Sequence, residues 1–201
     1  MKIYLATNNK GKIREINTLF KGTGIEFIGG VDLSSVVEDG NDYRDNALIK
    51  ALFVYKHSST YVVSEDSGLE VDALDGAPGV HSARYADLLK ANNAADIDNI
   101  AKLLTALKDV PLEKRTAKYV SAFCFIDGGV ESFFMGEVHG KIIDAPRGTL
   151  GFGYDPIFVP DGYDRTFAEL GDEVKNKISH RAVASAKLRD FLVDKFLKRS
   201  G

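Results

Sequence analysis

The chain has 201 residues, of which 44% are hydrophobic and 27% charged, values typical of one globular domain and unlike disordered or collagen-like chains. With 26 basic and 29 acidic side chains, the formal net charge is −3, which disfavours a nucleic-acid-binding module. No run approaches the roughly 18 apolar residues of a membrane span, and the apolar start ends after Ala6. We therefore expect one domain over residues 1–201, with no signal peptide, no membrane contact and no nucleic-acid partner.

The chain contains a single cysteine, Cys124, which stands among apolar residues. It cannot close an intramolecular disulfide, and its neighbours are typical of a buried strand. The sequence therefore predicts a buried small side chain and a reducing, cytoplasmic setting.

Strand and helix patterns alternate in the first third of the chain, which predicts an α/β fold. Apolar residues at helical spacing indicate a first helix that ends before Gly22 and a second that begins after Asn41 or Asp42. In chain order we expect a strand at 2–7, a helix at 12–20, a strand at 25–28, a helix ending near 57–58 and a strand at 61–64.

The rest of the chain gives less regular signals. A Ser-Gly pair in the acidic stretch 64–77 predicts a tight bend, and the Gly/Pro-rich stretch 145–160 predicts a loop, either ordered or disordered. Asp127-Gly128-Gly129 separates two alternating runs and predicts a hairpin. The expected elements are a helix at 98–107, strands at 117–126 and 130–143, and a closing helix at 182–198.

A polar loop joins the first predicted strand to the first helix. Unpaired N–H groups at a helix start, together with hydroxyl, amide and ammonium groups, can cradle a phosphate. The order of residues is not that of a P-loop, and a simple helix cap with solvent-facing lysines is the alternative. The candidate phosphate-binding residues are Thr7, Asn8, Asn9, Lys10, Gly11 and Lys12.

Acidic residues gather after the second and third predicted strands. Carboxylates at such positions suit Mg²⁺, which prefers hard oxygen ligands and leaves room for substrate. Asp42 and Asp45 are explained as first-turn helix acids, whereas Glu38 and Asp66 are candidate metal ligands, with Glu65 as a further candidate.

A glycine-rich loop near residue 150 carries aromatic side chains that could stack on a flat ring. The alternative is a turn that anchors core aromatics. Lys175, His180 and Arg181 are donors suited to purine oxygens or phosphates, while no pattern supports a serine hydrolase or a histidine metal site. The candidate nucleoside-binding residues of the loop are Phe152, Gly153, Tyr154 and Asp155.

Several motifs together closely resemble the Ham1/RdgB-like inosine triphosphate pyrophosphatase family, nearly end to end and in order. They are Thr7-x-Asn9-x-x-Lys12, Glu38, Asn46-Ala47-x-x-Lys50-Ala51, Glu65-Asp66-Ser67-Gly68-Leu69, Gly76-x-Pro78-Gly79-x-x-Ser82-Ala83-Arg84-Tyr85, Gly151-Phe152-Gly153-Tyr154-Asp155-Pro156 and Ser179-His180-Arg181.

The resemblance implies a homodimeric, Mg²⁺-dependent enzyme that hydrolyses ITP, dITP and XTP to the monophosphate and pyrophosphate. It also implies a long mixed central sheet flanked by helices, with two lobes and the nucleotide in a cleft between them. Its metal carboxylates fall on Glu38 and Asp66, its general base on Asp66, a substrate contact on Ser67 and a basic phosphate-cleft residue on Lys50.

Two residues depart from the family pattern. Glu65 stands where many members have Asp, and Leu150 stands where Gly is usual. Neither departure touches the chemistry, so we expect activity to be retained, with selectivity open to change.

Donors such as Lys175, His180 and Arg181 would favour a 6-oxopurine over adenine, whereas guanine would have to be refused at its 2-amino group. Two other functions remain open: a Maf-like pyrophosphatase for modified pyrimidine nucleotides, and a catalytically silent nucleotide sensor.

Overall fold

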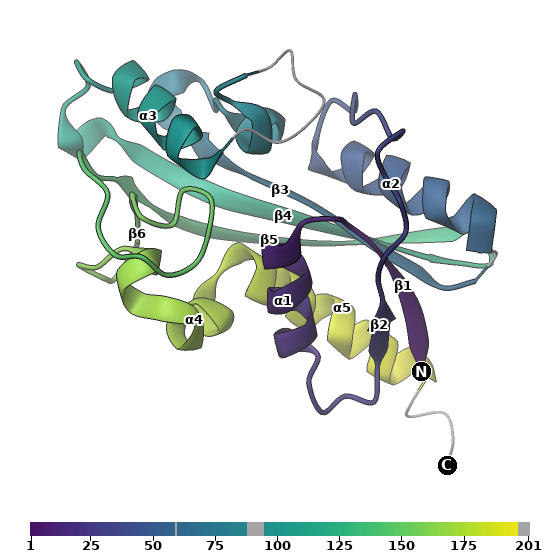
Figure 1. Cartoon of the computed structure of the whole chain (residues 1–201). Coiled ribbons are helices and arrows are strands. Elements are labelled where there is room, and N and C mark those ends of the chain that lie inside the picture. Colours follow the sequence, from purple (N-terminus) through teal and green to yellow (C-terminus); the bar gives the residue numbers. More distant parts are fainter. Residues whose placement is uncertain (59, 88–94, 197–201) are drawn as a thin grey trace. The chain divides into compact units, whose positions relative to one another are not determined.

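The structure is a computed structural model that describes residues 1–58, 60–87 and 95–196. Its strands form a mixed six-stranded sheet with helices packed on it, which confirms the α/β fold (Figure 1). The strand order is β2-β1-β3-β4-β5-β6; β1 runs parallel to β2 and β3, and β5 runs antiparallel to β6. The strands are β1 (Lys2–Ala6), β2 (Glu26–Ile28), β3 (Val62–Val71), β4 (Thr116–Asp127), β5 (Val130–Ile142) and β6 (Phe158–Pro160).

Five α-helices and three short 3₁₀ helices lie within the described residues. The closing helix begins earlier than expected, and expected helix residues 197–198 lie outside the described part of the chain. The helices are α1 (Lys10–Leu19), α2 (Tyr43–Ser58), α3 (Asp96–Ala106), α4 (Phe167–Ile178), α5 (His180–Phe196), η1 (Asp72–Leu74), η2 (Gly79–Arg84) and η3 (Leu112–Lys114).

The chain divides into two compact units, and β3, β4 and β5 contribute residues to both. The first unit comprises Met1–Asp66, Ser121–Gly136 and His180–Gly201; the second comprises Ser67–Val120 and Glu137–Ser179.

The first unit has an apolar cluster on each face of its strands, because successive side chains of a strand point to opposite faces. On one face α1 and α5 cover Leu5 and Val63; on the other α2 covers Ala6 and Val62 (Figure 1). Cys124 is buried in the second cluster as predicted, and burial raises the pKa of its thiol to about 12.

The second unit has its own core. Leu69 and Val71 of β3 pack there with α3 and with the aromatic residues of β4, β6 and α4. The Tyr119 and Phe158 rings meet edge to face, with centroids 4.8 Å apart, an arrangement that aromatic pairs favour.

The predicted bend after Ser64 is wrong, because β3 continues through Ser67 and Gly68 to Val71. The strand lies between β1 and β4, and most of its residues are buried. The two acids of this stretch, Glu65 and Asp66, lie within the strand, where each has an ion-pair partner.

The hairpin prediction is confirmed, and α4 is an element that the sequence pattern did not reveal. Gly128 and Gly129 join β4 to β5 with φ of 57° and 84°, the left-handed backbone that a two-residue turn needs. Stretch 145–160 contains only the short strand β6. Helix α4 begins with a capping box in which Thr166 and Glu169 bind each other's backbone N–H groups.

Candidate functional site

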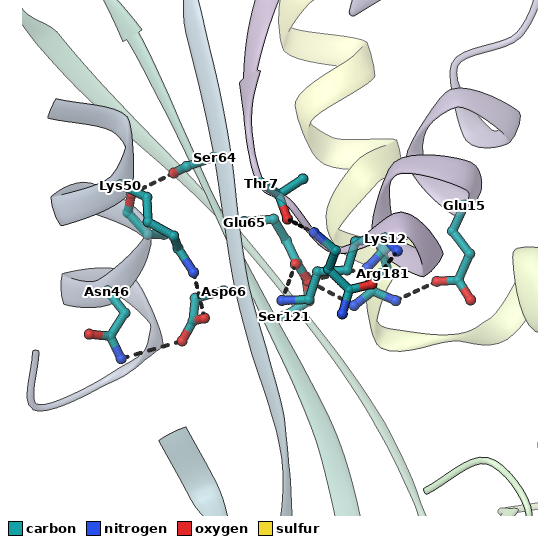
Figure 2. A network of polar contacts seen from close by, with 12 residues as sticks. Thr7, Lys12, Glu15, Asn46, Lys50, Ser64, Glu65, Asp66, Ser121 and Arg181 are labelled. Carbon is teal, nitrogen blue, oxygen red and sulfur yellow. Dashed lines mark hydrogen bonds and ion pairs between the residues drawn. The ribbon is translucent and has the colours of Figure 1, made fainter. Parts of the chain in front are cut away.

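Strand β3 places its two adjacent acids on opposite faces. Asp66 points toward α2, and Glu65 points toward α1 and α5 (Figure 2). Both are buried, with exposed fractions of 0% for Glu65 and 6% for Asp66. The alternation of a strand therefore gives each carboxylate a separate set of partners.

On the α2 face, one ammonium bridges two carboxylates. Lys50 Nζ lies 2.8 Å from Asp66 Oδ1 and 2.8 Å from Glu38 Oε2. Asn46, one helical turn before Lys50, donates from Nδ2 to Asp66 Oδ2 at 3.4 Å and accepts from the Gly40 amide at 2.9 Å. Asn46 thereby ties the loop that carries Glu38 to the strand that carries Asp66.

The acids at the start of α2 have structural roles, as expected. Asp42 Oδ1 accepts from the Asp45 amide at 2.9 Å, and Asp45 Oδ2 accepts from the Asn41 amide at 3.2 Å. These bonds satisfy N–H groups at the helix start.

The pKa values of the two carboxyl groups on either side of the ammonium are shifted in opposite directions, because burial and Lys50 act against each other at both groups. Burial raises the pKa of Asp66 above its ordinary value even though Lys50 opposes the rise. At Glu38 burial also acts to raise the pKa, but Lys50, together with Lys12 and a hydrogen bond with Asp66, outweighs it and the net pKa is lowered. Burial would lower the pKa of Lys50, but its two carboxylate partners raise it.

The residues on this face fit a Mg²⁺ ion held jointly with a phosphate substrate. Two carboxylates, Glu38 and Asp66, converge on one cationic group, and Mg²⁺ is commonly bound by one or two carboxylates plus substrate phosphates. Across residues 1–58, 60–87 and 95–196, no group of three or more His, Cys, Asp or Glu side chains is arranged to hold a metal ion by itself.

The loop before α1 is a helix cap with an ion pair attached. Asn9 is the N-cap and accepts from the Lys12 amide at 3.0 Å, while its own amide donates to Thr7 Oγ1 at 3.2 Å. Lys12 Nζ lies 2.7 Å from Glu65 Oε2, whereas the Lys10 side chain is exposed. The helix cap of the alternative interpretation is thus present, but Lys12 points inward to Glu65 instead of facing solvent.

Asn8 has a structural contact in the same loop. With its amide oriented to satisfy both ends, Nδ2 donates to the Val31 carbonyl at 3.0 Å and Oδ1 accepts from the Leu33 amide at 3.3 Å. These two hydrogen bonds therefore join the segment after β2 to the loop before α1.

The α1 and α5 face of β3 gathers charged side chains around Glu65. Arg181, in the first turn of α5, donates to Glu65 Oε1 from Nη2 at 3.1 Å and from Nε at 3.2 Å, and also pairs with Glu15. Ser121 of β4 donates to the same Glu65 oxygen at 2.8 Å. Burial opposes ionisation of Glu65, but Arg181 and then Lys12 hold its pKa well below the ordinary range. His180 is also buried and contributes in the same direction.

The second unit brings together the other predicted nucleoside-binding residues. Lys175 Nζ lies 2.5 Å from Asp155 Oδ2 and 4.5 Å from the centre of the Phe152 ring. Asp155 Oδ2 also accepts from the Phe152 amide at 2.9 Å. Gly151 has φ of 79°, and a Cβ there would overlap the same carboxylate oxygen, so glycine is needed for this close approach.

The remaining predicted residues of this unit differ in environment. Tyr154 is a core residue whose hydroxyl donates to the Ser82 carbonyl at 2.9 Å, and burial raises its pKa. The Gly153 amide donates to Asp96 at 2.6 Å. Ser67, the first residue after Asp66, is half-buried.

Four partner residues were not predicted to have a site role: Glu15, Asn46, Ser121 and Asp96. Asn46 and Glu15 could have been found by helical spacing, because they stand four residues before Lys50 and three after Lys12. Ser121 and Asp96 carry no such local signal, since their contacts join segments distant in the sequence.

Comparison with known proteins identifies the family. The model of the Ham1 family matches residues 3–191. The chain belongs to the Ham1 family. This Ham1 family member is 45% identical over 195 residues to a dITP/XTP pyrophosphatase of Porphyromonas gingivalis, covering 96% of this chain and 97% of the relative. It is also 45% identical to a dITP/XTP pyrophosphatase of Geobacter sulfurreducens, with 95% and 96% covered.

Solved structures of the family confirm the fold. The Ham1 protein of Staphylococcus aureus has a TM-score of 0.83 at 37% identity, covering 97% of this chain and 100% of its own. A Ham1 protein of Coxiella burnetii has a TM-score of 0.84 at 36% identity, with 96% and 99% covered. In the described part of this family member, every helix is too short or too polar to cross a membrane.

Proposed function

We propose that this Ham1 family member is a pyrophosphatase that hydrolyses ITP, dITP and XTP to the nucleoside monophosphate and pyrophosphate, removing them from the nucleotide pool. The observation that carries the proposal is the pair Asp66 and Glu38 bridged by Lys50 beside the first unit's β3 strand. The relatives named dITP/XTP pyrophosphatase support the substrate class.

Glu38 and Asp66 would hold Mg²⁺ together with oxygens of the triphosphate. When bound, the ion would offset phosphate charge and lower the pKa of a coordinated water.

Asp66 is the proposed general base. Its raised pKa makes the carboxylate a better proton acceptor than an exposed aspartate. Asp66 takes a proton from water as the water oxygen bonds to the α-phosphorus. The bond from that phosphorus to the bridging oxygen breaks, and pyrophosphate leaves with the electron pair.

The cationic side chains offset the charge that develops on the leaving group. Lys50 is buried beside Asp66, and Lys12 lies in the first turn of α1, where backbone N–H groups also point outward from the helix start. In phosphoryl transfer such positioned charge supplies most of the catalytic effect.

The polar pair of the second unit supports selectivity for 6-oxopurines. A 6-oxopurine presents an acceptor oxygen beside an N–H donor, whereas adenine presents the opposite pattern. Lys175 donates and Asp155 accepts within 2.5 Å of each other, and the Phe152 ring offers a stacking surface. An adenine base would leave these groups badly paired. His180 and Arg181 remain further candidate donors.

The test is an assay of the purified protein with Mg²⁺ against ITP, dITP, XTP, GTP, ATP and dUTP that resolves pyrophosphate from orthophosphate. Pyrophosphate from ITP, dITP and XTP, with little from ATP or GTP, is the expected result. Orthophosphate would mean attack at the γ-phosphorus. Release of pyrophosphate from dUTP rather than from the purine nucleotides would favour the Maf-like alternative, and nucleotide binding without turnover would favour a sensor.

We also propose that the protein is a homodimer and acts in the cytoplasm. Both follow from the resemblance to the family and from the nucleotide pool as the source of its substrates. Light scattering on the eluting peak of a size-exclusion column tests the dimer, since a monomer mass across the concentration range would contradict it.

A further inference from the structure

Glu65 is a buried carboxylate that the proposed reaction does not use. It faces away from Asp66, toward α1 and α5 (Figure 2). One oxygen, Oε2, lies 2.7 Å from Lys12 Nζ, and the other, Oε1, accepts from both Arg181 and Ser121. A single side chain on β3 thus contacts a cation from each of two helices.

The surrounding charges show what Glu65 does for those cations. Its side chain is fully buried, that of Arg181 is 2% exposed and that of Lys12 is 13% exposed. Two cations so far removed from water stay together only if carboxylates compensate them. Glu15 also pairs with Arg181, but the structure places Glu65 against both cations at once.

We propose that Glu65 is a positioning residue that holds the Lys12 ammonium and the Arg181 guanidinium in a fixed relation for substrate binding. The proposal rests on the proposed function, because that function makes Lys12 a phosphate-binding residue and Arg181 a nucleoside-binding residue. Glu65 itself touches neither substrate nor metal in this role. This role accounts for a buried acid next to the proposed base, Asp66, without making Glu65 a metal ligand.

The Glu65→Gln variant keeps the size of the side chain but removes its charge. Lys12, the more exposed cation, then lies near Arg181 with less compensation, and its ammonium turns toward solvent. The Glu65→Asp variant keeps the charge on a shorter stem and is expected to restore much of the effect. Ser121→Ala is the matched control, because it removes one hydrogen bond to Glu65 but no charge.

The first readout is the rate at which a water-soluble amine reagent labels Lys12, measured by peptide mass spectrometry with exposed Lys10 as the internal reference. In the wild type Lys12 is expected to react ~10-fold more slowly than Lys10, because an amine that is ion-paired and only 13% exposed is protected. Glu65→Gln should bring the two rates together, while Glu65→Asp and Ser121→Ala should keep Lys12 slow. This readout needs no turnover, so it separates failure of the positioning role from failure of the proposed function.

The second readout is kinetic. Glu65→Gln should lower kcat/KM for ITP by ~10²-fold, the order expected when binding groups move by about an ångström, and should weaken inhibition by pyrophosphate. In a Lys12→Met background the same substitution should weaken pyrophosphate inhibition no further, because the cation through which it acts is gone.

Two results would overturn the positioning role. One is a Glu65→Gln variant that is folded by circular dichroism but still protects Lys12; the other is additive effects of Glu65→Gln and Lys12→Met on pyrophosphate inhibition. If Glu65→Gln does not fold, the labelling rates of Lys12 and Lys10 in the wild type and in Glu65→Asp test the positioning role. Equal labelling of Lys12 and Lys10 in wild type, or unprotected Lys12 in folded Glu65→Asp, contradicts the proposal.

Discussion

Asp66 has surroundings that pull its pKa in two directions. Burial favours the neutral acid and Lys50 favours the carboxylate, and the net pKa is raised. A carboxylate whose pKa is raised in this way accepts a proton more readily than an exposed aspartate. The cost is a carboxylate buried beside a second acid, Glu38, which is tolerated only because Lys50 lies between them.

Replacing Asp66 with Asn should lower kcat for ITP by at least ~10²-fold, the usual size of a general-base effect, while the protein stays folded. Steady-state pyrophosphate release and circular dichroism measure the two parts of this prediction. Asp45→Asn is the matched control, because Asp45 is an exposed helix acid and its loss should leave kcat within a few-fold. A kcat near wild type in Asp66→Asn would remove Asp66 from the role of base.

Phe152 is half-buried, and the Lys175 ammonium lies 4.5 Å from the centre of its ring. If the ring also stacks on the purine, Phe152→Ala should raise KM for ITP by ~10-fold or more, since stacking is worth about 1–3 kcal/mol per base. Phe152→Tyr keeps an aromatic face and should change KM much less. An unchanged KM in Phe152→Ala would assign the ring to packing alone.

Strand β5 lies very close to the first turn of α5 at Gly136. A Cβ on Gly136 would overlap the His180 carbonyl oxygen and the Ala184 amide nitrogen. These are backbone atoms that cannot turn aside, so glycine at this position sets how near the helix lies to the strand. The same helix turn carries Arg181 toward Glu65.

Gly136→Ala should therefore destabilise the protein by about 1–3 kcal/mol, the range for overpacking, and should lower kcat/KM because the first turn of α5 is displaced. Urea unfolding and ITP kinetics measure both. Gly29→Ala is the control, because no atom lies within 4 Å of a Cβ at Gly29. Equal stability of the two variants would show that α5 can shift without cost.

The elements with regular patterns were predictable, and those that depend on distant partners were not. The β4–β5 hairpin and α2 follow from local turn and capping chemistry, and both are confirmed. The Ser-Gly pair predicts that strand β3 ends at Ser64, but the strand continues, and Lys12, Lys50 and Arg181 neutralise its two acids. Helix α4 was missed because Gly171, with φ of 75°, interrupts it.

The candidate site divides in the same way. The acidic pattern predicts a shared role for Glu38 and Asp66, the resemblance to the family adds Lys50, and the structure brings these three side chains into contact. Spacing did not predict that Glu65 and Asp66 face opposite sides, because that follows only once β3 is known to continue past them. The role of Glu65 as a metal ligand stays a prediction, and its placement beside Lys12 and Arg181 favours a different one.

At the scale of the whole molecule, the net charge is only −3, yet several charged side chains are buried together in the first unit. Glu65 is fully buried and its pKa is lowered, chiefly by Arg181 and Lys12 against the effect of burial. A carboxyl group with a folded-state pKa below its unfolded value of about 4.3 binds protons more readily when the chain unfolds. Its contribution to stability is thus present above that unfolded value and is lost as the pH falls below it.

The stability of the whole chain should therefore depend on pH through Glu65. Glu65→Gln should lower the free energy of unfolding by about 3–5 kcal/mol at pH 7, as expected when one partner of a buried ion pair is removed. The gap from wild type should stay constant down to about pH 5 and narrow as the pH falls further. Urea unfolding of both proteins across this range measures it, with Glu26→Gln, an exposed acid, expected to show little gap at any pH. A gap that stays constant or widens on acidification would mean that Glu65 is not held as the carboxylate by Lys12 and Arg181.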